Sequence, residues 1–169
     1  VDVLVTDLTM PGRSGLEFIK DVHALRPDLP VLVLSMHDEQ LYAERVLRAG
    51  ARGYVMKDAG AEKLLAALRQ VLAGAPYVSP TISARLLEGL TGRPRGSSSP
   101  LEKLSDREFE VFRLLGQGKT TKEVASELGL SPKTVAVHRE HIKDKLALKD
   151  ATALMRAAVR WVEAEGRDY

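Results

Sequence analysis

A ten-residue stretch, TGRPRGSSSP at 91–100, divides the chain into two parts with different sequence patterns. It holds two glycines, two prolines and three serines, and it has no large apolar side chain. Such a segment cannot bury apolar surface, and it interrupts the periodicity of both helices and strands. Because the pattern changes across it, we interpret it as a linker between two domains. A long surface loop within one domain is the alternative.

Before this linker, short apolar runs alternate with runs of helical periodicity. The apolar runs, each expected to be a strand, are VDVLVTD at 1–7, VLVLS at 31–35 and GYVMK at 53–57. The expected helices cover residues 14–25, 41–50, 61–74 and 81–90. Apolar strands that alternate with helices are typical of a parallel sheet covered on both faces. The first part is therefore expected to have an α/β fold.

After the linker the sequence predicts helices alone, over residues 105–118, 120–130, 131–146 and 151–165. Thr120 and Glu123 have the spacing of a capping box, and Ser131 followed by Pro132 is a typical helix start. A tight turn is expected at Gly129, between the second and third helices. Two helices joined in this way, between two supporting helices, are typical of an all-α helix-turn-helix domain.

The composition excludes several kinds of function. The chain has no cysteine, which excludes disulfides, thiolate catalysis and cysteine-ligated zinc. It has no stretch long and apolar enough to span a bilayer, and we expect a cytoplasmic protein with no membrane partner. Residues 1–90 carry a net charge of −1 and residues 91–169 a net charge of +3. That difference does not by itself indicate nucleic-acid binding.

Polar side chains stand at the ends of the three expected strands: Asp7, Ser35 and Lys57. The carboxyl ends of parallel strands meet at one edge of a sheet, so these residues are expected to lie close together. An aspartate can attack a phosphoryl group, while an ammonium and a hydroxyl bind its oxygens and Mg²⁺ neutralises the charge. Taken singly, such residues are more often turn residues, helix caps or solvated side chains.

The motifs DLTMPG at 7–12, LS at 34–35 and GYVMK at 53–57, with their separations, resemble the receiver domain of bacterial response regulators. The resemblance implies that a sensor histidine kinase phosphorylates Asp7, and that Ser35, Lys57 and Tyr54 form the switch at the phosphoryl site. It also implies a Mg²⁺ ion bound by Asp7 and the backbone carbonyl of Thr9. For Tyr54, a plain surface aromatic is the alternative.

The resemblance covers only the later part of a receiver, whose strands have the order 2-1-3-4-5. The chain matches the last three strands and helices, and the acidic pair that completes the family's Mg²⁺ site would precede Val1. We therefore expect an N-terminally truncated receiver in which residues 1–7 form an exposed apolar edge. These residues in isolation are expected to be phosphorylated weakly or not at all. Asp58 stands where the family usually has proline.

The second part resembles the LuxR-type helix-turn-helix domain. The matching motifs are LSDRE at 104–108, GKTTKEVASELGLS at 118–131, KTVAVH at 133–138 and KL at 145–146. Together with a receiver, this makes the chain similar to the NarL/FixJ-type response regulators of two-component systems. The resemblance implies a transcription regulator that binds double-stranded DNA, as a homodimer when active. We place the partial receiver at 1–78, a linker helix and flexible linker at 79–102, and the DNA-binding domain at 103–167.

In the third helix of the second part, Val135, Ile142 and Leu146 fall on one side and are expected in the core. The opposite side is expected to enter the major groove, with its small apolar residues suited to a thymine methyl group. Nearby lysines are expected to contact phosphates. For His138 and His141, packing is slightly favoured over DNA contact. The predicted DNA-binding residues are Lys119, Lys122, Lys133, Thr134, Ala136, Val137, His138, Glu140 and Lys143.

Several alternatives remain open from the sequence. In the last helix, Leu154, Val159 and Trp161 either form a dimer contact or close the core of their own domain. A haloacid-dehalogenase-like phosphotransfer enzyme also uses an aspartate nucleophile, but it needs a second aspartate where Thr9 stands. An adaptor with a degenerate receiver, whose activity does not depend on phosphorylation, is another alternative. Salt-sensitive DNA binding would distinguish a regulator from a helix-turn-helix that binds no DNA.

Overall fold

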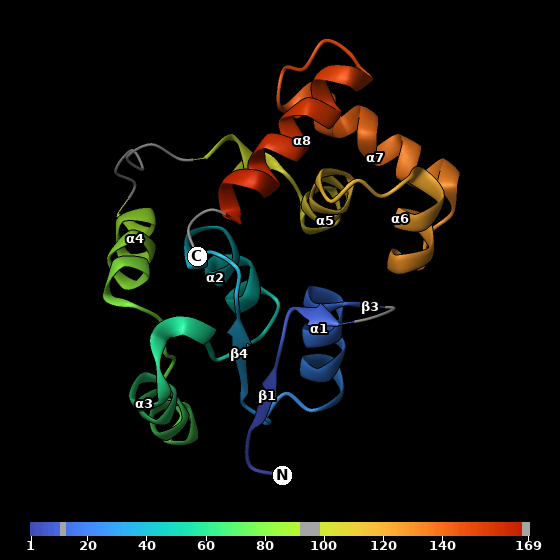
Figure 1. The fold of residues 1–169 in the computed structure, drawn as a ribbon. Coiled ribbons are helices and arrows are strands. Elements are labelled where there is room, and N and C mark those ends of the chain that lie inside the picture. The colour runs from blue at the N-terminus through green and yellow to red at the C-terminus, as the bar shows by residue number, and fades with distance from the viewer. Residues whose placement is uncertain (11–12, 92–98, 167–169) are drawn as a thin grey trace. The chain divides into compact units, whose positions relative to one another are not determined.

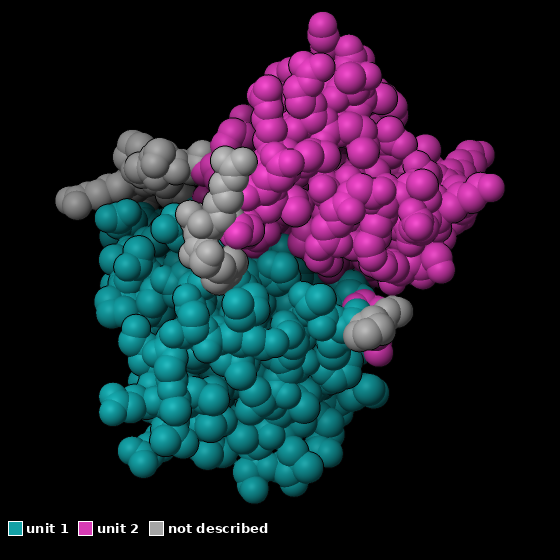
Figure 2. All heavy atoms as spheres, viewed as in Figure 1, with its two compact units in different colours: residues 1–10, 14–97 teal, residues 11–13, 98–169 magenta. Residues whose placement is uncertain are grey.

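The computed structural model describes residues 1–10, 13–91 and 99–166 (Figure 1). The chain forms two compact units, coloured separately in Figure 2. Unit 1 covers residues 1–10 and 14–97, and unit 2 consists mainly of residues 98–169. Residues 92–98, which make up most of the linker inferred from the sequence, lie outside the described residues. Each unit has its own apolar core.

The sheet of unit 1 has three parallel strands in the order β1 (Leu4–Thr6), β4 (Val31–Ser35) and β5 (Gly53–Met56). Thr6 lies opposite Val33, and Ser35 lies opposite Met56. Among the described residues β1 pairs with β4 alone, and Val5 is 43% exposed. This confirms the expectation that the first apolar run forms an edge strand. The regular strand is shorter than that run because pairing begins only at Leu4.

Helices supply the rest of the core of unit 1: α1 (Gly15–Leu25), α2 (Glu39–Arg48), α3 (Ala61–Leu72) and α4 (Pro80–Leu90). Leu32 and Val55 pack against Ala67 and Val71 of α3. Val31 and Val33 point to the opposite face of the sheet, and both are fully buried. Burial on both faces explains why residues 31–34 are all apolar, with the polar Ser35 only at the end of the strand.

Helix α4, which the sequence placed in the linker region, packs within unit 1. Ser79 caps its first turn and also donates a 2.7 Å hydrogen bond to Glu39 of α2. Arg85 donates a 2.9 Å hydrogen bond to the backbone carbonyl of Gln40. Ile82 is 2% exposed, so the inner face of α4 is part of the core.

Short elements were not predicted from the sequence. The strands β2 (Thr9–Met10) and β3 (Arg13–Ser14) form a two-stranded sheet, and η2 (Pro100–Lys103) is a 3₁₀ helix that precedes α5. The third strand was expected to run through Lys57, but β5 ends at Met56. Lys57 instead opens the 3₁₀ helix η1 (Lys57–Ala59). The chain therefore turns at the lysine and presents it at the end of the sheet.

Unit 2 is helical, as the sequence predicted, with α5 (Asp106–Gly116), α6 (Thr121–Leu128), α7 (Pro132–Lys145) and α8 (Ala151–Glu165). The predicted capping box of Thr120 and Glu123 is present, and Ser131 caps α7 with Pro132 in its first turn. Gly129 has a φ of 63°, the left-handed backbone that ends α6 and turns the chain into α7. The largest fully buried side chains of its core are Phe109, Phe112, Leu114, Leu115, Ile142 and Leu154.

Helices α5 and α8 approach each other closely at Gly116. A Cβ atom at this position would lie 2.6 Å from Val162 Cγ2 and 2.8 Å from the carbonyl carbon of Ala158. We expect Gly116→Ala to lower the free energy of unfolding of unit 2 by about 2 kcal/mol, because the methyl group meets backbone that cannot yield. Urea denaturation followed by helical circular dichroism measures this change.

The matched control is Gly166→Ala. Among the described residues, the nearest atom to a Cβ there is Val162 O at 3.5 Å, and Gly166 has an ordinary right-handed backbone. The control is expected to change the unfolding free energy by less than about 0.5 kcal/mol. Equal midpoints for the two alanine variants would contradict the close packing of α5 on α8.

Candidate phosphoryl site and nucleic-acid interface

Asp7 and Lys57 meet at the carboxyl end of the sheet in unit 1. Lys57 Nζ lies 2.6 Å from Asp7 Oδ2, and the backbone N–H of Thr9 donates a 3.1 Å hydrogen bond to Asp7 Oδ1. Asp7 follows β1 and Lys57 follows β5, so the pair reaches across the end of β4, which lies between them. The parallel sheet therefore brings together two residues that are 50 positions apart in sequence.

The environment of Asp7 keeps its carboxyl group ionised. Partial burial alone would raise the pKa of Asp7. The hydrogen bond from Lys57, the backbone N–H of Thr9 and the positive charge of Lys57 together outweigh burial and lower the pKa below its ordinary value. Asp7 is therefore an anion at neutral pH, which is the form that acts as a nucleophile.

Ser35 lies at the end of β4 but is fully buried. Its Oγ accepts a 3.2 Å hydrogen bond from the backbone N–H of His37. Ser35 makes no hydrogen bond to Asp7 or Lys57 within the part of the chain that the structure describes. Of the three predicted strand-end residues, the structure joins the aspartate and the lysine directly and holds the serine beneath the loop that follows β4.

Tyr54 on β5 is buried, with only 1% of its surface exposed. Its hydroxyl donates a 2.5 Å hydrogen bond to the backbone carbonyl of His37. The alternative of a plain surface aromatic is therefore wrong. Tyr54 anchors the same loop whose first residues contact Ser35.

His37 connects these groups, and sequence reasoning missed it. Its Nε2 lies 3.0 Å from Thr9 Oγ1, and its ring stacks on Tyr42 with centroids 4.8 Å apart. The loop after β1 and the loop after β4 are thereby joined beside Asp7. The sequence did hold a signal for His37. It lies two residues after the strand-end residue Ser35, just as Thr9 lies two residues after the strand-end residue Asp7.

Asp7 can supply part of a Mg²⁺ site. Magnesium takes oxygen ligands and is usually held by one or two carboxylates together with phosphate oxygens and waters. The Asp7 carboxylate, 28% exposed, fits one such position. Within the described ranges, the one cluster of three potential His, Asp or Glu ligands lies in unit 2 and not at Asp7. The described residues therefore supply an incomplete ligand set for this ion.

Helix α7 presents the face that was predicted to enter the major groove. Val135 and Ile142 are fully buried on the core side as expected, while Leu146 is half-buried. Val137 is 46% exposed and adds an apolar side chain to this outer face. Lys143 is partly covered and pairs with Glu140 at 2.8 Å. The other predicted contacts that are exposed on this helix are Lys133, Thr134, Ala136 and Glu140.

The two phosphate contacts predicted near the start of α6 differ from one another. Lys122 is exposed, whereas Lys119 forms an ion pair with Glu127 within its own unit. Arg139, which sequence reasoning did not single out, donates a 2.8 Å hydrogen bond from α7 to Thr121 Oγ1 at the start of α6. That contact joins the two helices of the helix-turn-helix.

The last helix uses its apolar residues within unit 2. Leu154 is fully buried, and Trp161 packs edge-on against Phe109 with ring centroids 5.5 Å apart. The ring of Phe112 lies 5.9 Å from Trp161. These contacts favour the alternative in which α8 closes the core of its own domain. No helix within the described residues has the length and hydropathy needed to cross a membrane.

Comparisons with known families agree with the division into two units. Residues 1–69 match the family described as the response regulator receiver domain. Residues 102–158 match the family described as bacterial regulatory proteins, luxR family. The first match contains Asp7 and Lys57, and the second contains α5, α6, α7 and the first half of α8.

Individual relatives match along most of their length. The chain is 39% identical over 164 residues to the oxygen regulatory protein NreC of Staphylococcus carnosus, covering 94% of this chain and 76% of NreC. It is 36% identical over 159 residues to the response regulator GacA of Pseudomonas aeruginosa, covering 94% and 74%. Among solved structures, RcsB from Salmonella enterica serovar Typhimurium bound to promoter rprA has a TM-score of 0.64 and 30% identity, covering 92% and 74%.

Proposed function

We propose that phosphorylation of Asp7 controls the binding of DNA by this chain, which belongs to the two-component response regulators with a receiver and a LuxR-type DNA-binding domain. Membership of this family makes the chain a DNA-binding transcription regulator and not an enzyme. The alternative of a haloacid-dehalogenase-like enzyme is therefore wrong. We place the receiver part at 1–78 and the DNA-binding domain at 103–167, with a connecting region at 79–102 whose helix α4 packs on unit 1.

The contact between Asp7 and Lys57 is the observation that carries the proposal. An ionised carboxylate stands at the end of a parallel sheet with an ammonium 2.6 Å away. In the proposed step, an Asp7 oxygen attacks the phosphorus of a phosphohistidine on a sensor kinase. A P–O bond forms, the P–N bond breaks, and the imidazole of the kinase leaves. Lys57 is then placed to pair with the phosphoryl oxygens of the acyl phosphate.

Mg²⁺ supplies positive charge beside the phosphoryl oxygens when it is bound, and Asp7 and the backbone carbonyl of Thr9 are the groups of this chain that would hold it. The switch lies in the loop after β4. The Ser35 hydroxyl is proposed to turn toward the new phosphoryl group and to release its contact with the backbone of His37. Since Tyr54 bonds to the carbonyl of His37, this movement loosens the buried tyrosine. The signal thus begins as a local change of hydrogen bonds.

The output is proposed to be α7 in the major groove of double-stranded DNA. The exposed residues on its outer face support this, as does the solved RcsB relative that was bound to a promoter in the presence of a phosphomimetic. We propose that the active form is a homodimer, which would raise affinity by binding two half-sites at once. A cytoplasmic location follows from the proposed target and kinase partner.

DNA binding that depends on salt tests this function. The affinity of the chain for a mixed-sequence duplex, measured by fluorescence anisotropy, should fall about 40-fold between roughly 50 and 200 mM salt if three lysines each neutralise one phosphate. Lys122, Lys133 and Lys143 are the proposed residues. An adaptor that binds no DNA would show no binding at either salt concentration, and that result would overturn the proposal.

A further inference from the structure

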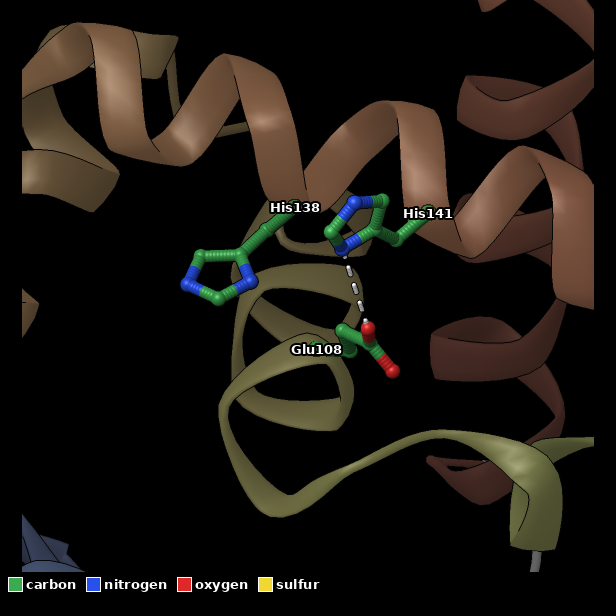
Figure 3. Close-up of side chains that lie close together, drawn as sticks. All are labelled: Glu108, His138 and His141. Carbon is green, nitrogen blue, oxygen red and sulfur yellow. Dashed lines mark ion pairs between the residues drawn. The ribbon is translucent and has the colours of Figure 1, made fainter.

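Glu108 of α5 and two histidines of α7 lie close together within unit 2. His138 and His141 are three residues apart, so they lie on the same side of the helix. Each of the three side chains offers one donor atom, and these atoms lie within 4.8 Å of one another. Figure 3 shows both imidazoles next to the carboxylate, with one ring nitrogen of His138 turned toward the other two side chains.

The two oxygens of Glu108 have different surroundings. Oε2 accepts a 2.7 Å hydrogen bond from Lys145 Nζ and a 2.8 Å hydrogen bond from the backbone N–H of Ser105. Oε1 instead faces His141, whose Nδ1 lies 3.6 Å away (Figure 3). Only 5% of the Glu108 side chain is exposed, so these contacts fix its position. Oε2 is therefore occupied by contacts within the unit, while Oε1 faces the histidines and is available as a ligand atom.

His138 contributes a ring nitrogen that the protein itself does not satisfy. Its Nδ1 is buried and has no hydrogen-bond partner among the residues that the structure describes. A buried polar atom of this kind is costly in a folded protein and calls for an explanation. Burial, as the largest cause, lowers the pKa of His138, and the nearby His141 and Arg107 act in the same direction against the charge of Glu108. The unpartnered Nδ1, turned toward Glu108 and His141, is placed to act as a ligand atom.

We propose that Glu108, His138 and His141 bind a divalent transition-metal cation, with Zn²⁺ as the best-suited ion. Two imidazole nitrogens and one carboxylate oxygen form a three-ligand set that zinc accepts, with a water molecule in the fourth position. The His141 side chain is 55% exposed, which leaves the site open to solvent on that side. The site is proposed independently of the function of the phosphoryl site.

The geometry requires only a small adjustment. Metal–ligand distances near 2.1 Å in a tetrahedron place donor atoms about 3.4 Å apart. The donor atoms span up to 4.8 Å in this structure, so binding must draw them together. The exposed His141 can rotate to do so while the buried Glu108 stays in place. Lys145 shares the charge of Glu108, and the affinity should therefore be lower than that of a closed four-ligand site.

The site would connect α7 directly to α5. Helix α7 carries the proposed DNA-contacting face, and His138 is one of the residues that the sequence suggested for that role. With metal bound, His138 would share the ion with Glu108 of α5 and would no longer be able to contact DNA. The ion would also add a cross-link between two helices of the core, and such binding to the folded state alone stabilises it.

Zinc binding by the full chain without an affinity tag tests the proposal. Competition between the protein and a chromophoric chelator should show one equivalent of Zn²⁺ bound, and the Co²⁺ form should show the visible absorption of a tetrahedral site. We expect His141→Asn and His138→Gln each to weaken the affinity at least tenfold. The helical circular dichroism of both variants checks that they are folded.

His23→Gln is the matched control, because His23 is exposed in unit 1 and takes no part in the cluster. This variant should bind Zn²⁺ as tightly as the unaltered chain. Equal affinities for the unaltered chain, His138→Gln and His141→Asn would overturn the proposal. Loss of binding in His23→Gln alone, or failure of the unaltered chain to bind one equivalent, would also overturn it.

Discussion

Replacing Val137 with aspartate should weaken specific DNA binding about 100-fold and leave the fold of unit 2 intact. Val137 is 46% exposed at the middle of the proposed contact face of α7. The change removes an apolar side chain suited to a thymine methyl group and places a negative charge in the major groove. Like charges brought together at an interface cost several kcal/mol, and about 2.8 kcal/mol corresponds to the expected factor.

The measurement is fluorescence anisotropy on a promoter duplex selected with the unaltered chain, at one fixed salt concentration. Leu87→Asp is the matched control, since Leu87 of α4 is 63% exposed and the substitution changes the net charge by the same amount. The control should bind DNA as the unaltered chain does. If Val137→Asp is folded and binds equally well, α7 does not present the contact face and the proposed orientation of unit 2 on DNA is wrong.

Local patterns in the sequence were sufficient for most of the fold. The run at 31–35 became β4 with the predicted bounds, because a strand buried on both faces is nearly all apolar, and here only its last residue, Ser35, is polar. The start of α7 followed from Ser131 and Pro132, whose capping roles depend only on neighbouring residues. Where a feature depended on a few adjacent residues, the prediction was correct within a residue or two.

The pairing of Asp7 with Lys57 could be predicted for a different reason. Both residues follow strands, and a parallel arrangement alone brings the ends of such strands to one edge. No comparable rule predicted the contacts of His37 with Thr9 and Tyr54, because these contacts depend on how the chain folds over the end of the sheet. Topology thus predicted which strand ends meet, and it could not predict the hydrogen bonds within the loops.

Side-chain pairs between helices were the least accessible from sequence. Lys119 was expected to contact a phosphate, yet it pairs with Glu127 in this structure. Lys145 and Glu108 are 37 residues apart and join α7 to α5 by a 2.7 Å hydrogen bond. Many charged residues could form such pairs equally well in the unfolded chain. The packing of the surrounding apolar residues decides which of these pairs forms. The periodic pattern of apolar residues in the sequence does not show which pair that is.

Replacing Asp7 with asparagine should remove phosphorylation of the protein in the cells that produce it. Asparagine has nearly the same shape as aspartate but no carboxylate to attack phosphorus, so no acyl phosphate can form. The fold should be little affected, because the ion pair with Lys57 is partly exposed on both sides and such pairs contribute at most about 1 kcal/mol. Phosphate-affinity electrophoresis of extracts from stimulated cells should show a retarded band that the variant lacks.

Asp58→Asn provides the matched control for this loss. Asp58 lies next to Lys57 at the same end of the sheet, is exposed, and undergoes the same chemical change. A retarded band in this control and its absence in Asp7→Asn would assign the phosphoryl group to Asp7 and not to its acidic neighbour. The opposite pattern would move the phosphoryl site to η1, and Lys57 could then no longer be the group that stabilises an acyl phosphate at the end of β1. A band retained in both variants would exclude the proposed switch at this end of the sheet, since its hydrogen bonds through His37 begin beside Asp7.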